Sequence, residues 1–133
     1  MKDQVTSIEQ SKRLIELEVP AQKASMIYQS HFTQGVPKLY AQPYQRNGYP
    51  PKEKIREDVV PAFTVADLLG LLPPKISCQD PSDGNFRMRR YMGENGIEWV
   101  VDYDRFIAND VSIINVLVEA IILLVSTKHE LNI

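Results

Sequence analysis

The segment from Val111 to Val125 constrains the fold more than any other part of this chain. It is almost continuously apolar, and its apolar residues recur at the spacing of an α-helix. Three polar residues interrupt it: Ser112, Asn115 and Glu119. At about 15 residues it is too short and too polar to span a bilayer. We therefore predict a core helix over about 111–128, capped by Asn109 or Asp110, that other elements must cover.

Two alternating segments upstream predict the sheet that covers this helix. Phe86–Tyr91 and Ile97–Tyr103 follow the two-residue period of a strand, and Gly93-Glu-Asn-Gly96 between them is typical of a hairpin turn. With Lys75–Gln79 as a further strand, they predict an antiparallel meander with one face on the core. The core face is expected to carry Ile97, Trp99, Val101 and Tyr103.

The N-terminal segment predicts a pair of helices. Thr6-Ser-Ile-Glu9 has the spacing of a capping box, and helix formers follow to about Glu18. Pro20 suits the first turn of a second helix, which we expect to end near Gln29. The tight turn between the two helices resembles that of a helix-turn-helix. The second helix carries only Lys23 as a basic residue, so packing of a helical hairpin is favoured and DNA binding stays as an alternative.

The middle of the chain predicts a loop and one short helix. Residues 44–58 are polar and without periodicity, so we expect a mobile loop there, preceded by an edge strand at Lys38–Gln42. Thr64-Val-Ala-Asp67 repeats the capping pattern and starts an apolar helix that Pro73-Pro74 ends. Together the elements predict one α+β domain over 1–133. In it, a small antiparallel β-meander packs against a long C-terminal helix, with an N-terminal helical pair and a short central helix.

Charge and cysteine content restrict the partners and the compartment. The 133 residues contain 15 Lys and Arg against 17 Asp and Glu, and a net charge of −2 argues against a general polyanion binder. A single cysteine, Cys78, cannot form an internal disulfide, and the N-terminal residues lack the apolar core of a signal peptide. We therefore expect a cytoplasmic protein that is not bound to a membrane.

No group of titratable residues has the spacing of a catalytic or metal site. His31 and His129 have no ligand partner at a suitable distance in the sequence. Cys78 has only Lys75 nearby to activate its thiol. Asp80-Pro-Ser-Asp-Gly84 lacks the alternating ligands and the closing Glu of a calcium loop. The sequence predicts no catalytic residue, no metal and no cofactor.

The best candidate site is a basic and aromatic surface. Arg87, Arg89 and Tyr91 are predicted to share one strand face, as in sheets that bind single-stranded nucleic acid. The interpretation we favour is a solvated face on which Arg87 and Arg89 pair with Glu98 and Asp102 on the next strand. Three further tyrosines are candidates for an interaction face: Tyr40, Tyr44 and Tyr49.

Several stretches of the chain also carry a family resemblance. They are Glu9–Leu17, Val19–Ala21 with Ala24, Pro61–Pro73, Trp99–Tyr103 and Leu117–Leu124. Together they resemble a family of small uncharacterised proteins from gut Bacteroidetes that is often associated with phage-like or conjugative elements. The resemblance covers most of the chain except about 40–57, and the tail Thr127–Ile133 departs from the longer polar endings of the family. Since the family has no established activity, the resemblance implies no catalytic or binding residue.

These observations lead to three functional hypotheses. The first is a non-enzymatic accessory or protein-interaction domain of a mobile element, with an unknown protein partner and with the oligomeric state left open. The alternative is a nucleic-acid-binding regulator, which uses either the N-terminal helices or the Arg-rich strand face. The third is a small enzyme without a recognisable motif. Absence of nucleic-acid binding at low salt would exclude the regulator.

Overall fold

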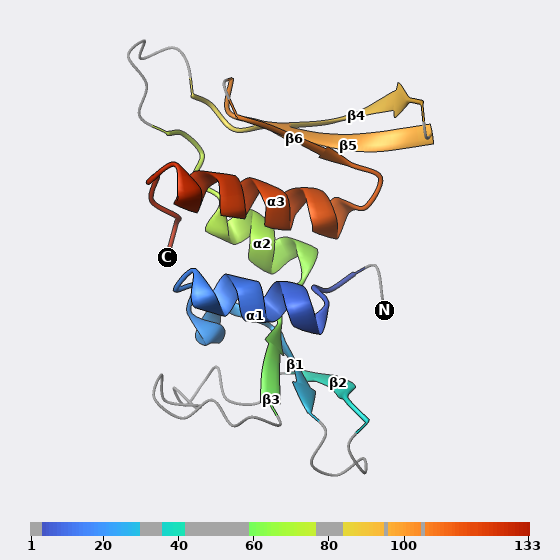
Figure 1. The fold of residues 1–133 in the computed structure, drawn as a ribbon, viewed down its shortest axis with the longest axis vertical. Coiled ribbons are helices and arrows are strands. Elements are labelled where there is room, and N and C mark those ends of the chain that lie inside the picture. Colours follow the sequence, from blue (N-terminus) through green and yellow to red (C-terminus); the bar gives the residue numbers. More distant parts are fainter. Residues whose placement is uncertain (1–3, 30–35, 42–58, 77–83, 95, 105) are drawn as a thin grey trace. The chain divides into compact units, whose positions relative to one another are not determined.

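The computed structural model describes residues 4–29, 36–41, 59–76, 84–94, 96–104 and 106–133. The chain divides into two compact units, Met1–Asp67 with Ile133 and Leu68–Asn132, and each contains helix and sheet (Figure 1). The predicted α+β composition is confirmed. A single domain over 1–133 stays a prediction, and the predicted loop at 44–58 lies outside the described residues.

In its described residues, the N-terminal unit contains helix α1 (Ile8–Glu16) and an antiparallel sheet. The 3-10 turn η1 (Ala21–Lys23) follows α1, and the strands are β1 (Met26–Gln29), β2 (Lys38–Ala41) and β3 (Val59–Ala62). The strand order is β2-β1-β3, so β2 is the edge strand that the sequence predicts at this place. Helix α1 contacts β3, and α2 (Val65–Leu71) follows β3 closely in the chain.

The predicted N-terminal helical pair is wrong, because a strand takes the place of the second helix. The turn η1 is preceded by Pro20 as its N-cap, and β1 then becomes the central strand between β2 and β3. Hydrogen bonding to a strand on each side outweighs the helical tendency of residues 20–29. The helix-turn-helix interpretation therefore loses its second helix.

The start of α1 also differs from the prediction. Instead of a capping box over Thr6–Glu9, Ser7 Oγ accepts the Gln10 N–H at 3.1 Å, and the Gln10 side chain accepts the Ser7 N–H at 2.9 Å. The box at the start of α2 is confirmed. There Thr64 Oγ1 accepts the Asp67 N–H at 3.1 Å, and Asp67 Oδ2 accepts the Thr64 N–H at 2.9 Å.

In the C-terminal unit, helix α3 (Ile113–Ser126) lies along an antiparallel meander (Figure 1). The strands are β4 (Arg87–Gly93), β5 (Gly96–Asp102) and β6 (Ile107–Asp110), in the order β4-β5-β6. Helix α3 contacts β5 and β6. Its buried residues are Ile114, Val116, Leu117, Val118, Ala120, Ile121 and Leu124. The predicted long C-terminal core helix is confirmed.

Two details of this unit differ from the prediction. The third strand of the meander is β6 and not Lys75–Gln79, of which Lys75 forms an isolated bridge with Asn85. Because residues 107–110 pair with β5, they are extended and cannot begin a helix. Ser112 is therefore the N-cap of α3, in place of the predicted Asn109 or Asp110.

Helices α1 and α3 both end at a residue with left-handed backbone. Glu18 after α1 has φ 68°, and Lys128 after α3 has φ 63°. In each case the next residue donates its N–H back to the last turn, from Val19 to the Leu14 carbonyl at 3.1 Å and from His129 to the Leu124 carbonyl at 2.9 Å. This is the Schellman arrangement, in which glycine is the least strained residue at the left-handed position.

Replacing Lys128 with glycine is expected to raise the free energy of unfolding by about 0.5–1 kcal/mol, because glycine has no Cβ to strain the left-handed backbone. Urea-induced unfolding followed by circular dichroism measures the change. Lys128→Ala is the matched control, since it removes the charge but keeps the Cβ. A glycine variant no more stable than the alanine variant contradicts the prediction.

Candidate functional site

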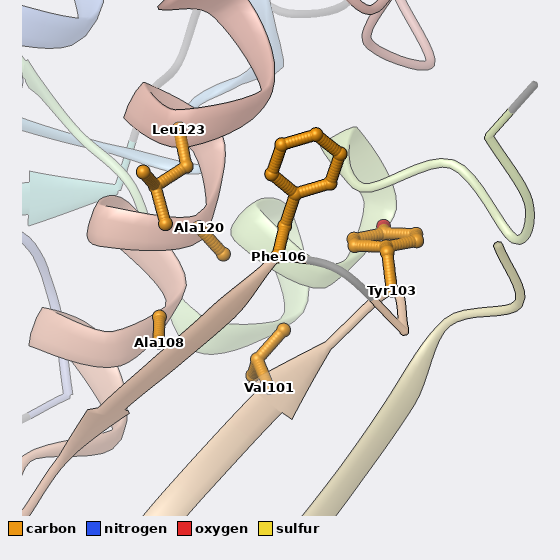
Figure 2. A pocket seen from close by; sticks show the side chains of 6 residues that line it. All are labelled: Val101, Tyr103, Phe106, Ala108, Ala120 and Leu123. Atoms are coloured by element: carbon orange, nitrogen blue, oxygen red, sulfur yellow. The ribbon is translucent and has the colours of Figure 1, made fainter. Parts of the chain in front are cut away.

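The sheet of the C-terminal unit presents one face to α3 and the other away from it. Val101 of β5 and Ala108 of β6 project toward Ala120 and Leu123 of α3 (Figure 2). Side chains alternate along a strand, so the neighbouring residues point to the opposite side, which we call the open sheet face. By the strand register, this face carries Arg87, Arg89, Tyr91, Glu98, Val100, Asp102, Ile107 and Asn109.

The hollow between the sheet and α3 has no room for a ligand. Its lining is apolar apart from the hydroxyl of Tyr103, and the lining side chains leave no space for a bound molecule (Figure 2). The Tyr103 hydroxyl donates to the Pro73 carbonyl at 2.7 Å, and burial raises the pKa of Tyr103. This phenol therefore keeps its proton and serves packing and hydrogen bonding.

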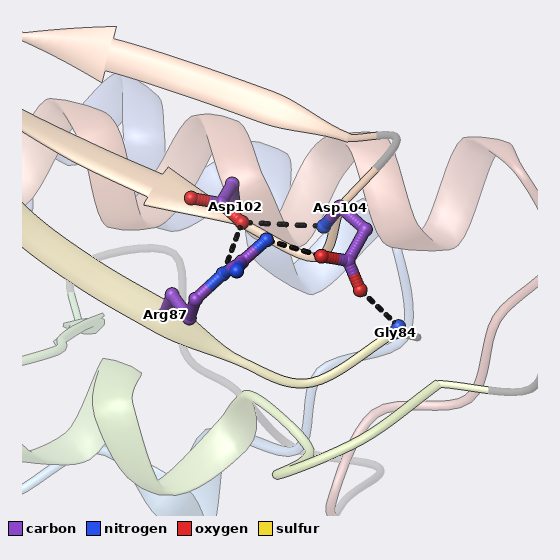
Figure 3. Close-up of polar contacts among 4 residues, drawn as sticks. All are labelled: Gly84, Arg87, Asp102 and Asp104. Atoms are coloured by element: carbon purple, nitrogen blue, oxygen red, sulfur yellow. Dashed lines mark hydrogen bonds and ion pairs between the residues drawn. The ribbon is translucent and has the colours of Figure 1, made fainter. Parts of the chain in front are cut away.

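Arg87 is bound to two carboxylates at one end of the open sheet face (Figure 3). Its Nε donates to Asp102 Oδ1 at 3.0 Å, and its Nη2 donates to Asp104 Oδ1. Asp102 Oδ1 also accepts the Asp104 N–H at 3.2 Å, and Asp104 Oδ2 accepts the Gly84 N–H. Only 7% of the Asp102 side chain is exposed, so its charge requires the neighbouring guanidinium. The Arg87–Asp102 pair falls within the predicted pairing of Arg87 and Arg89 with Glu98 and Asp102, and it joins the start of β4 to the end of β5.

Arg89 does not form its predicted ion pair. It lies opposite Val100 and is exposed, and none of the described residues forms an ion pair with it. Glu98 lies opposite Tyr91 instead, and the Tyr91 hydroxyl donates to Glu98 Oε2 at 2.5 Å. This hydrogen bond raises the pKa of Tyr91. The positive charge of Arg89 is therefore open to a partner.

The tip of the β4–β5 hairpin carries an exposed apolar pair. Met92 and Ile97 are direct cross-strand partners, and they are 74% and 48% exposed. Figure 1 shows the tip projecting past the N-terminal end of α3. The predicted core position of Ile97 is therefore wrong, because strand β5 becomes buried only from Val100 onward. Closeness to the Gly93–Gly96 turn is the sequence signal that marks these two residues as the farthest from the helix.

Of the three further candidate tyrosines, only Tyr40 lies within the described residues. Tyr40 lies on β2, within the N-terminal unit, and is 40% exposed. Tyr44 and Tyr49 lie outside the described residues. The candidate site is therefore the hairpin of the C-terminal unit, whose exposed side chains include Arg89, Arg90, Tyr91, Met92 and Ile97.

Comparison with known proteins finds no family model that matches the chain, and no match among curated proteins or solved structures. The resemblance to the Bacteroidetes family stays a prediction. Within the described ranges, no three His, Cys, Asp or Glu side chains are grouped to hold a metal ion. Nor is any helix in those ranges both long enough and apolar enough to cross a membrane.

Proposed function

We propose that this chain is a protein-interaction domain and that the β4–β5 hairpin is its binding surface. The observation that carries the proposal is the exposed Met92–Ile97 pair at a hairpin tip that α3 does not cover. Exposed apolar groups of this size gain free energy when a partner removes them from water. Tyr91, Met92 and Arg89 are also of the residue types that are enriched at protein interfaces.

Nucleic acid fits the same surface less well. Arg87 is neutralised by Asp102 and Asp104, so only two of the arginines on β4 stay open to a phosphate. Since binding of a polyanion grows with the number of phosphates that cations contact, two arginines support only weak binding. The proposal of an accessory role in a mobile element, with a cytoplasmic location, rests on the family resemblance and on the sequence.

The double variant Met92→Ser/Ile97→Ser tests the proposed surface. Tagged protein is used to capture partners from the native cell, and the bound proteins are quantified by mass spectrometry after nuclease treatment. We expect the double variant to capture the partner at least about tenfold less than the unmodified chain, because central apolar contacts dominate binding at interfaces. Both residues are exposed, so thermal unfolding should be nearly unchanged.

Ile107→Ser is the matched control. Ile107 is 59% exposed on β6 of the same sheet and does not lie at the hairpin tip. It should capture the partner as well as the unmodified chain does. Equal capture by all three proteins contradicts the hairpin proposal, and capture that nuclease treatment abolishes favours the nucleic-acid alternative.

A further inference from the structure

We infer that the outer edge of β4 binds an extended, acidic segment of a partner protein as an added strand. The inference rests on the proposed function and specifies the partner and the way in which it binds. Strand addition uses main-chain hydrogen bonds for affinity and side-chain contacts for selectivity.

The strand register determines which backbone groups of β4 face outward. Tyr103 donates its N–H to the Phe106 carbonyl at 2.9 Å, so the odd-numbered residues of β5 form their hydrogen bonds with β6. The even-numbered residues of β5 then bond to β4, and their partners there are the odd-numbered residues. The N–H and C=O groups of Met88, Arg90 and Met92 therefore point away from β5, along an edge that no described strand occupies.

The same edge is already hydrogen-bonded immediately before β4. Phe86 donates its N–H to the Pro74 carbonyl at 2.9 Å, and Lys75 and Asn85 form an isolated antiparallel bridge. Phe86 is two residues before Met88, so its N–H belongs to the same outward row. An added strand would continue this row of hydrogen bonds along β4.

Charge identifies the chemistry of the added strand. Strand β4 reads Arg-Met-Arg-Arg-Tyr-Met-Gly and has no acidic side chain. Arg89 and Arg90 are both exposed and point to opposite faces of the sheet. The guanidinium of Arg90 lies 5.0 Å from the ring centroid of Trp99, which holds it beside the sheet without neutralising it. Two consecutive acidic residues on an added strand would place one carboxylate on each face, near each arginine.

A second copy of this chain is a poor occupant of the edge. If β4 paired with β4 of a second copy, the arginines of both strands would lie on neighbouring strands. Like charges on neighbouring strands destabilise a sheet, and charged edge strands are a common protection against such self-pairing. The edge therefore selects an acidic segment of another protein.

The experiment uses the full chain, labelled with 15N, and a capped octapeptide in which valine and threonine flank a central Glu-Asp pair. Backbone amide shifts give the affinity, and hydrogen exchange reports new hydrogen bonds. At saturation, we expect the amides of Met88, Arg90 and Met92 to exchange at least about tenfold more slowly. Arg89→Glu should weaken binding at least about fivefold, because it places a like charge beside the peptide carboxylates.

The matched control variant is Lys23→Glu, which makes the same change of charge in the N-terminal unit and should bind like the unmodified chain. Three control peptides complete the test. One carries Lys-Lys at its centre. The other two keep the acidic sequence and are N-methylated at alternate residues, one at the odd-numbered positions and one at the even-numbered positions. The lysine peptide should not bind, and at least one N-methylated peptide should fail to slow exchange along β4.

Three results would overturn the inference. They are the absence of binding by the acidic peptide, equal binding of both N-methylated peptides, and protection of the same amides by oligothymidylate instead of the peptide. If capture of the partner depends on Met92 and Ile97 but the acidic peptide does not bind, only the inference of strand addition is wrong. The proposed hairpin surface then stands. If substitution of Met92 and Ile97 does not reduce capture of the partner but the acidic peptide still binds β4, the proposal of a hairpin-tip surface is wrong and the inference of strand addition stands.

Discussion

Replacing Thr6 with valine is expected to lower the free energy of unfolding by about 2–4 kcal/mol. Thr6 is fully buried, and its Oγ1 accepts the Phe63 N–H at 3.0 Å and lies 2.7 Å from Ser11 Oγ. Valine has nearly the same shape but no hydroxyl. The variant would therefore leave a buried N–H and a buried hydroxyl without a partner, and each such group costs about 1–3 kcal/mol.

Urea-induced unfolding of Thr6→Val and of Thr6→Ser separates the hydroxyl from the methyl group. The serine variant keeps the hydroxyl and should lose only about 1 kcal/mol for the missing methyl group. A third substitution, Ser11→Ala, should destabilise the Thr6→Val variant less than it destabilises the unmodified chain, because the two hydroxyls interact with each other. A valine variant as stable as the serine variant is inconsistent with a role for this hydroxyl.

Replacing Asp67 with alanine is expected to lower the free energy of unfolding by about 2–4 kcal/mol. Asp67 accepts three hydrogen bonds: from the Ser25 N–H at 2.7 Å, from the Ser25 hydroxyl at 2.6 Å and from the Thr64 N–H at 2.9 Å. The first two join positions 42 residues apart in the chain. A hydrogen bond to an ionised acceptor contributes about 1.5–3 kcal/mol, and partial exposure of this carboxylate reduces the sum.

Thermal and urea unfolding of three variants test this role of Asp67. Asp67→Asn keeps one acceptor oxygen and should lie between the alanine variant and the unmodified chain. Glu9→Ala is the matched control, because Glu9 is an acidic residue in the first turn of α1 that is exposed. It should change stability by about 0.5 kcal/mol or less. An alanine variant at position 67 that is no less stable than the Glu9 control would show that the link to Ser25 is weak.

The parts of the fold that could be predicted are those that local patterns determine. Helix α3 has apolar residues at helical spacing, and the β4–β5 hairpin has alternating strands around a Gly-containing turn. Strand β1 could not be predicted, because it is held by pairing with distant strands, such as Met26 with Ala62. Strand β6 has only four residues, which is too short a segment to show a period.

In the candidate site, too, the sequence predicts what the hairpin register determines and misses what other contacts determine. Arg87 and Asp102 lie opposite each other once the hairpin register is known, so their pairing could be predicted. Glu98 could not be assigned, because the Tyr91 hydroxyl reaches its carboxylate from directly across the strand pair. The alternating pattern assigns Ile97 to the core face, and only its closeness to the Gly93–Gly96 turn indicates that α3 does not reach it.

The contacts of the two units span very different lengths of chain, and this sets an order of folding. Strands β4, β5 and β6 are joined by short turns, whereas Thr6 bonds to Phe63 across 57 residues. Hairpins form in about 1–10 μs. A contact across a long loop forms more slowly, because closing the loop costs conformational entropy. During synthesis, β1 therefore emerges from the ribosome before its partner β3. The nascent chain then exposes an incomplete sheet, which is the stage at which chaperones would bind it.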